Sequence, residues 1–404
     1  MARERRMSAE LAIHGGKPIR SEPFPASPQA TDAIRTRVLA TLDSGRWWQS
    51  GHGSGQVEAL EQWLTDFHGV LGAVAVTNGT HALEVAYRAA GVRPGDEVLV
   101  PGITFIATAS AVSARGATPV PVDVLPGTIC MNPADCEAKI TERTRVIAPV
   151  HLAGQPANMT EIMDIARRHE IAVVEDNAQA IGAEWEGKRT GSFGDLAITS
   201  FQAGKLLPAG EGGGITIRDN VQFLRAVQEI VNHGTARGQK WYQHDLVASN
   251  YRMAEIPAAI VLAQVDDYEA RRLRRQTSAE LLTHILKSDE TVTPIEVDPR
   301  VTRMAWSNYF LRLPKTVSTA MSHIEFASAL AAEGVPANVL YPPWYSTRAY
   351  TVDRPVGPQN CPEADRAGRE VIWLLHTLLD AGEEGVADIA AAIRKVVRWC
   401  EANS

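Results

Sequence analysis

The sequence predicts an α/β protein in which a mainly parallel sheet, covered by helices on both faces, is followed by a smaller α/β domain. Two observations favour this fold class. Between about residues 70 and 220, short runs rich in Val and Ile alternate with helical patterns, and the runs are continuously apolar, as in strands buried on both faces. The chain has 404 residues, 45% of them apolar, which is enough for about two globular domains.

The predicted elements of the first domain follow in chain order. AVAV (residues 73–76) is a strand, and Asn78 caps a helix that ends at Gly91. The strand EVLV precedes a helix of small residues over about 103–115. Five further strands are expected, with a helix over Met159–His169 between the second and third: TPVPVDV, RVIAPV, IAVVED, LAITSF and GITI. Ligands of such open sheets bind at the carboxyl ends of the strands.

The pattern changes after about residue 265. A long charged helix (Gln264–Leu286) leads into a strand within WSNYFLRLP and two further helices, His323–Glu333 and Glu383–Glu401. We therefore expect three segments: an N-terminal arm over 1–25, a large domain over 26–265 and a small C-terminal domain over 266–404.

Charge and cysteine content disfavour several classes of protein. Forty Lys and Arg against 47 Asp and Glu give a formal charge of −7, so we expect no nucleic-acid partner. The densest basic run is interpreted as a solvated helix face: Arg271, Arg272, Arg274 and Arg275. Four cysteines without C-x-x-C spacing predict neither a disulfide framework nor a metal site. With no apolar signal segment or membrane span, the expected location is cytoplasmic.

Polar residues that suit a phosphorylated ligand follow two of the predicted strands. Asn78-Gly79-Thr80 opens a helix, whose N-terminus offers free N–H groups, while Gly79 lets a phosphate approach and Thr80 adds a hydroxyl. A simple helix cap would explain this tripeptide equally well. Ser200 ends the strand LAITS.

Two ionisable residues complete this group. Asp176 ends the apolar run IAVVED, where a carboxylate needs a cation or hydrogen-bond donors, and Gln179 follows three residues later. Lys205 lies among glycines and apolar residues in FQAGKLLPAGEGGG, where partial desolvation favours its neutral, nucleophilic form.

Together these residues are what pyridoxal 5'-phosphate requires. A lysine forms a Schiff base with the cofactor, and an aspartate pairs with its protonated pyridine nitrogen and keeps the ring an electron sink. Coulomb attraction of Asp176 for that nitrogen is on the order of a few kcal/mol at an effective dielectric of about 20. Phe105, in PGITFIA, is placed to cover one face of the ring.

Several stretches in a fixed order resemble one known family: VTNGTHALEVA, DEVLVPGITFIATASAV, GATPVPVDV, VIAPVHLAGQPANM, EDNAQAIGA, SFQAGKLLPAGEGG and SNYRMAEIPAAI. The chain resembles the DegT/DnrJ/StrS pyridoxal-phosphate aminotransferases over nearly its whole length. The resemblance implies a fold-type I (aspartate aminotransferase-like) architecture, with a mainly parallel seven-stranded sheet in the large domain.

The resemblance also implies roles for single residues. Lys205 matches the lysine that bonds to the cofactor, Asp176 the partner of the pyridine nitrogen and Gln179 the partner of the 3-hydroxyl. Phosphate binders and the stacking aromatic match Gly79, Thr80, Ser200 and Phe105. Asn250, in SNYRM, matches an asparagine that reaches the phosphate of the neighbouring subunit, which implies a homodimer with shared sites. Asn177 departs from the pattern, because many members carry a small residue there.

Within the family, GRWWQSG, SFQAGK and VIWLLH are similar to two groups, the glutamine:scyllo-inosose aminotransferases and the 3-amino-5-hydroxybenzoate synthases. The expected activity is amination of a keto-cyclitol, keto-sugar or related cyclic ketone in antibiotic biosynthesis, with glutamine or glutamate as donor. An aminating and aromatising or dehydrating enzyme, or a non-catalytic regulatory protein, remain alternatives. Family position marks five substrate-facing candidates: Trp48, His151, His233, Tyr341 and His376.

Overall fold

The computed structural model describes residues 10–48, 55–235, 242–289, 292–357 and 359–403. A seven-stranded sheet lies at the centre of the larger part, with strand order β1-β9-β8-β5-β4-β2-β3. Its strands are β1 (Gly72–Val76), β2 (Glu97–Pro101), β3 (Thr118–Val122), β4 (Thr144–Ile147), β5 (Ala172–Asp176), β8 (Leu196–Ser200) and β9 (Gly213–Ile217). Six of the seven strands run in one direction and only β9 runs against them, so the expected mainly parallel sheet is confirmed.

Helices cover this sheet on both faces, as β1 shows residue by residue. Val74 and Val76 join the large core with residues of α4, whereas Ala73 and Ala75 join a separate core with residues of α3 and α9. This alternation is the two-residue period of a strand. The helices of this part are α2 (Asp32–Asp43), α3 (Gln56–His68), α4 (Gly79–Ala89), α5 (Ala107–Ala114), α6 (Pro133–Ala138), α7 (Met159–His169), α8 (Val221–Val231) and α9 (Glu255–Leu262).

The start of α4 is fixed by a side-chain cap. The Asn78 side chain accepts a hydrogen bond of 2.8 Å from the His81 N–H, which confirms the predicted cap. Behind this turn, β9 approaches without a side chain, since a Cβ on Gly213 would lie 2.6 Å from the backbone carbon of Asn78. The turn between β1 and α4 is therefore held from both sides.

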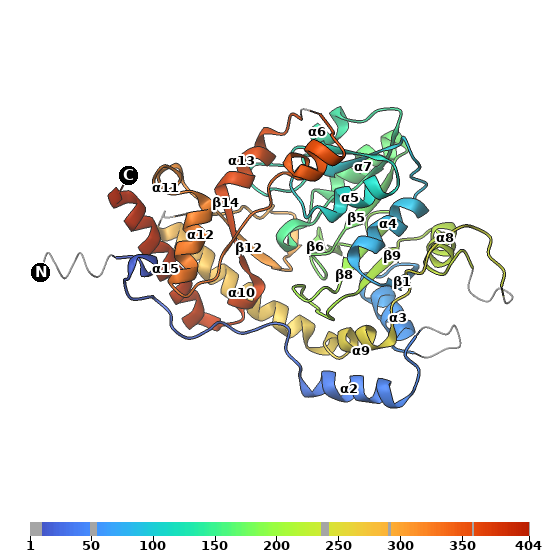
Figure 1. Cartoon of the computed structure of the whole chain (residues 1–404), viewed down its shortest axis with the longest axis horizontal. Coiled ribbons are helices and arrows are strands. Elements are labelled where there is room, and N and C mark those ends of the chain that lie inside the picture. The colour runs from blue at the N-terminus through green and yellow to red at the C-terminus, as the bar shows by residue number, and fades with distance from the viewer. Residues whose placement is uncertain (1–9, 49–54, 236–241, 290–291, 358, 404) are drawn as a thin grey trace, which may run out of the picture.

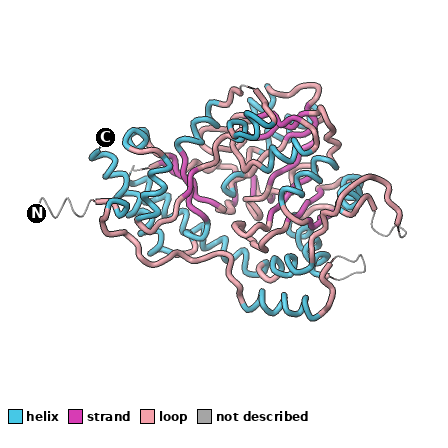
Figure 2. The backbone as a smooth tube through the Cα atoms, viewed as in Figure 1, coloured by secondary structure: helices cyan, strands magenta, loops and turns pink. Residues whose placement is uncertain are grey.

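The C-terminal part is built on a four-stranded sheet of order β10-β12-β14-β13, and Figure 2 shows the strands gathered in separate groups. Its strands are β10 (Thr293–Pro294), β12 (Asn308–Arg312), β13 (Asn338–Val339) and β14 (Val371–Leu375). The helices are α10 (Val265–Asp289), α11 (Lys315–Ala320), α12 (His323–Ala332), α13 (Pro362–Glu370), α14 (His376–Leu379) and α15 (Gly382–Asn403). A small sheet elsewhere joins β6 (Glu184–Trp185), β7 (Lys188–Arg189) and β11 (Val301–Arg303).

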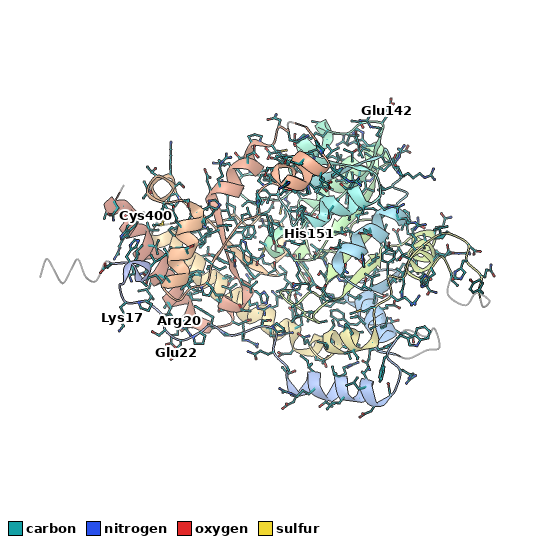
Figure 3. The ribbon with its side chains drawn as sticks, viewed as in Figure 1. Lys17, Arg20, Glu22, Glu142, His151 and Cys400 are labelled. Carbon is teal, nitrogen blue, oxygen red and sulfur yellow. The ribbon has the colours of Figure 1, made fainter. Side chains whose placement is uncertain are left out.

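The N-terminal segment packs against this C-terminal part. Leu11 is buried in its apolar core, and the backbone carbonyl of Lys17 accepts a hydrogen bond of 2.8 Å from Lys395 on α15. Arg20 forms an ion pair of 2.7 Å with Asp388 on the same helix, and both N-terminal residues lie beside α15 in Figure 3. The boundaries expected for the arm and the two domains stay a prediction.

The basic run on α10 is only partly exposed, in contrast to the solvated face that the sequence predicts. Arg272 is 4% exposed and Arg275 is 3% exposed, and their guanidinium groups pair with Glu269 and Asp380. The interpretation is wrong for these two residues because α14 and α15 pack on α10, so the arginines on that side meet partners instead of water. Arg274 is exposed, as expected.

The cysteines, the possible metal ligands and the helices were compared with what disulfide-linked, metal-binding and membrane-spanning proteins require. All four cysteines are free and buried. Within the described ranges, no group of three His, Cys, Asp or Glu is placed to hold a metal ion. None of the helices described is both long enough and apolar enough to cross a membrane.

Gly213→Ala should destabilise the protein. The added Cβ would meet the backbone of Asn78 at 2.6 Å and the Gly79 nitrogen at 3.0 Å, and backbone cannot move aside cheaply. We expect a loss of about 1–3 kcal/mol, measured by denaturant unfolding. Gly204→Ala is the control, because there the Cβ meets only the flexible Gln202 side chain. Equal stability of the two variants would contradict this packing.

Candidate active site

Asp176 lies at the carboxyl end of β5, the edge of the sheet where a ligand was expected. Its buried carboxylate accepts hydrogen bonds from the Thr108 hydroxyl (2.7 Å, at Oδ2) and from the Ala178 N–H (3.1 Å, at Oδ1). Both donors are neutral and compensate for the burial of the charge without cancelling it. The carboxylate is therefore set to pair with a cation at this edge.

Lys205 lies in the loop between β8 and β9 and is half-buried. Burial lowers the pKa of its ammonium group below the usual value of 10.5, and the negative charge of Asp176 acts in the opposite direction. A lowered pKa increases the fraction of neutral amine, which is the nucleophilic form. The structure thus brings these two predicted residues within electrostatic range of each other.

The N-terminus of α4 meets the end of β8. A Cβ on Gly79 would lie 2.9 Å from the Ser200 Cβ and 3.1 Å from its Oγ, so the two residues are in close contact. Gly79 and Thr80 are the first two residues of α4, whose opening N–H groups favour an anion. This corner can hold the phosphate of a cofactor.

Gln179 links the edge of the large sheet to two other predicted residues. Its Oε1 accepts a hydrogen bond of 2.9 Å from the Ala153 N–H. Burial raises the pKa of Tyr341, while a hydrogen bond to Gln179 lowers it and the charge of Asp176 raises it. The Tyr341 ring packs edge-on at 6.0 Å from Phe105, which is 53% exposed. Asp176, Gln179, Tyr341 and Phe105 therefore surround one site.

His376 begins α14 and is buried close to the same group. Burial lowers its pKa to about 3, the positive charges of Arg275, Arg271 and Lys205 act in the same direction, and the Ser307 backbone opposes them. The imidazole is consequently neutral near pH 7.

His151, labelled in Figure 3, is fully buried, and both of its ring nitrogens form hydrogen bonds. Its Nδ1 accepts from the Ala157 N–H at 3.0 Å, so its Nε2 carries the proton and donates to Glu175 at 2.9 Å. Burial would raise the pKa of Glu175, but this hydrogen bond and those from Gly191 and Gly194 lower it overall. His151 thus steadies β5, and its contact with substrate stays a prediction.

Three other predicted residues are exposed. Trp48 is 62% exposed, and His233 and Asn250 are also exposed. The Asn250 side chain accepts only from the Arg252 N–H, at 3.1 Å, among the residues that the structure describes. The neighbouring segments 49–54 and 236–241 lie outside the described residues. The roles expected for these three side chains stay predictions.

The structure also adds residues that sequence reasoning missed. Thr108 contacts Asp176, and Asn308 donates to Gln179 at 3.4 Å. A hydroxyl in the helix after β2 was a signal for Thr108, since that helix starts at the same edge of the sheet as Asp176. Asn308 comes from the C-terminal part and gave no such signal. The departure noted at Asn177 is a buried side chain, whose amide atoms have no partner among the described residues.

Comparison with known proteins decides the family. A model of the DegT/DnrJ/EryC1/StrS aminotransferase family matches residues 28–394. This chain belongs to that family. It is therefore an aminotransferase with pyridoxal phosphate as its cofactor, and its fold is the fold-type I architecture. The residues around Asp176 and Lys205 fit that cofactor, with a carboxylate for its pyridine nitrogen, an amine for its aldehyde and a helix N-terminus for its phosphate.

Individual members are similar over nearly the whole chain. A putative L-glutamine:3-amino-2,3-dideoxy-scyllo-inosose aminotransferase of Streptoalloteichus tenebrarius is 36% identical, across 98% of this chain and 100% of that protein. The 3-amino-5-hydroxybenzoate synthase of Amycolatopsis mediterranei is 35% identical, across 93% of this chain and 97% of that protein. A crystal structure of 3-amino-5-hydroxybenzoic acid synthase matches with a TM-score of 0.89 at 34% identity, across 94% of this chain and 100% of that chain.

Lys205→Met should change how stability depends on pH. Because the pKa of Lys205 is lowered in the folded apoprotein, the unfolded chain binds more protons below pH 10.5, and wild-type stability rises with pH in that window. The variant lacks this rise. In denaturant unfolding of the two apoproteins, the variant should be at least as stable as the wild type near pH 7. The difference in their free energies of unfolding should become smaller towards pH 10.

Lys287→Met is the matched control for this measurement, because Lys287 is exposed. It should follow the wild type at every pH. A wild-type advantage over Lys205→Met that grows as the pH falls would contradict the desolvated amine.

Proposed function

We propose that this aminotransferase transfers the amino group of L-glutamine to a ring ketone of a cyclitol in the biosynthesis of an antibiotic. The full-length similarity to the scyllo-inosose aminotransferase carries this proposal, because it spans both parts of the fold. The cluster of Asp176, Gln179, Lys205 and Tyr341 supports it, since an amine with a lowered pKa lies near polar side chains suited to bind a ring.

The roles of the site residues are part of this proposal. The cofactor supplies an electron sink next to the carbon that carries the transferred nitrogen. Lys205, whose pKa is lowered by burial, moves the proton at that carbon as general base and general acid. Asp176 holds the pyridine nitrogen protonated, Gln179 orients the ring through its 3-hydroxyl, and Phe105 covers one face. Gly79, Thr80 and Ser200 bind the phosphate.

A homodimer with shared sites completes the proposal. Large apolar side chains are exposed on α2 and just after it, at the edge of the molecule in Figure 1: Leu39, Leu42, Trp47 and Trp48. Contiguous exposed apolar surface is typical of interfaces. Asn250 is exposed as well, so it is free to reach the phosphate site of a second subunit.

A second candidate function is that of a 3-amino-5-hydroxybenzoate synthase, and the TM-score of 0.89 with that enzyme favours it. The two functions differ in their product. A cyclitol aminotransferase replaces one ketone oxygen on the ring with an amino group. The synthase also removes water and yields an aromatic ring that absorbs in the ultraviolet.

Reaction with glutamine tests the activity. L-Glutamine should convert the visible absorbance of the cofactor aldehyde into that of its amine form, and a keto-cyclitol should restore it. Lys205→Ala should slow this conversion by about 10²–10⁴-fold, as expected for loss of a general acid–base group, while Lys287→Ala should not. Mass spectrometry identifies which acceptor exchanges oxygen for nitrogen among keto-cyclitols, keto-sugars and cyclic ketoacids. Full activity of Lys205→Ala would refute the assignment.

Mixed dimers test the shared site. Asn250→Ala should weaken cofactor binding about tenfold or more, since it removes a hydrogen bond to a charged group. In a heterodimer of Asn250→Ala with Lys205→Ala, one site combines the intact Lys205 of one chain with the intact Asn250 of the other. That site should regain wild-type affinity and activity. If Asn250 served its own chain, neither site would recover.

A further inference from the structure

Three buried side chains near Lys205 have polar atoms without a partner. They are Arg275 on α10, Ser307 just before β12 and His376 at the start of α14, and we call them the donor cluster. Among the described residues, no hydrogen bond is made by Arg275 Nη1, Ser307 Oγ or His376 Nδ1. All three residues are at most 5% exposed. Native structures leave few buried polar atoms unsatisfied, so three in one place indicate a missing partner.

Backbone and ion-pair contacts hold the cluster together. The His376 N–H donates to the Ser307 carbonyl at 3.2 Å, next to the antiparallel pairing of β12 with β14. Arg275 forms a bidentate ion pair with Asp380, the residue after α14, through Nε at 2.8 Å and Nη2 at 2.9 Å. This bidentate pair fixes the guanidinium group and leaves Nη1 as its free end.

The cluster lies on the side of the C-terminal part that faces the cofactor residues. The charge of Lys205 acts on His376, and Asn308, the neighbour of Ser307, donates to Gln179 at 3.4 Å. A molecule that carries the transferred nitrogen to Lys205 is therefore brought near this cluster. Asp176 and Gln179 belong to the proposed cofactor site, which leaves the cluster for substrate.

The free atoms favour an anion. An arginine Nη is only a donor, a serine hydroxyl can donate, and a neutral imidazole donates through Nδ1 in one of its tautomers. Arg271 adds a second positive charge, since it also acts on His376. Asp380 is bound to Arg275, and no other carboxylate is hydrogen-bonded to the cluster within the described ranges. A carboxylate accepts several such bonds at once.

We propose that the donor cluster binds the α-carboxylate of the amino-acid donor. This inference rests on the proposed function, because it requires an amino acid as the source of nitrogen. In an α-amino acid the carboxylate carbon lies about 2.5 Å from the nitrogen, so a donor with its nitrogen at Lys205 carries its carboxylate into adjacent space. Arg275 and Ser307 then gain the partner that the chain itself does not provide.

Binding of a carboxylate that cannot react tests this site directly. Glutaramate (5-amino-5-oxopentanoate) is L-glutamine without its amino group, and calorimetry on the holoenzyme measures its Kd. Arg275→Lys should weaken binding about tenfold and Ser307→Ala about three- to tenfold. The matched control is Arg272→Lys, an equally buried arginine paired with Glu269, which should leave the Kd unchanged.

A substrate comparison separates carboxylate binding from a general structural effect. With 4-aminobutanamide, which is L-glutamine without its α-carboxylate, the variants should react as fast as the wild type. With L-glutamine they should react about tenfold more slowly. Ser307→Ala removes only an unpartnered hydroxyl, so its melting temperature should be unchanged or higher, and this variant keeps the test valid if Arg275→Lys folds poorly.

Each outcome decides one of the two proposals. If glutaramate binds the wild type and both variants equally, or binds none of them, the carboxylate site is wrong. If L-glutamine and 4-aminobutanamide slow together in the variants, the cluster acts only through structure and the inference also fails. If the wild type accepts nitrogen from no α-amino acid, the proposed function fails, while glutaramate binding still reports on the site.

Discussion

The electrostatic interaction between one amine, Lys205, and one carboxylate, Asp176, is the constraint on which the rest of the site depends. In the proposed site, Lys205 acts as a neutral amine, whereas Asp176 keeps its charge to hold a pyridinium nitrogen. The structure favours both states at one edge of one sheet, because β5 ends in a carboxylate held by two neutral donors and burial lowers the pKa of the lysine in the loop after β8. The absence of side chains at Gly79 and Gly213 lets β8 and β9 approach the start of α4, where the phosphate is proposed to bind.

The charges that act on His376 are positive. Arg275, Arg271 and Lys205 lower its pKa, as does its burial, so the imidazole stays neutral near pH 7. A neutral imidazole has one N–H and one lone pair, so it accommodates a carboxylate or a ring hydroxyl without changing its charge.

Much of the sheet was predictable, and so was the place of Asp176 at its edge, because these signals are local. IAVVED is an apolar run with a carboxylate at its end, and Asn78 precedes a helix that it caps. The site residues that the sequence did not reveal depend on contacts between distant segments. Arg275 meets Asp380 105 residues away, and Asn308 meets Gln179 across 129 residues, so no window of sequence shows that these polar residues are buried together. The role proposed for Asn250 involves a second subunit, so contacts within one chain cannot reveal it.

The docking of the N-terminal segment on α15 sets an order for biosynthesis. Arg20 and Asp388 are 368 residues apart in the chain, and Lys17 and Lys395 are 378 apart. Residues 17–20 therefore cannot dock until α15 has been synthesised, more than 360 residues later in the chain. Until α15 is made, the apolar core that buries Leu11 is incomplete, so this side chain stays exposed to water during synthesis.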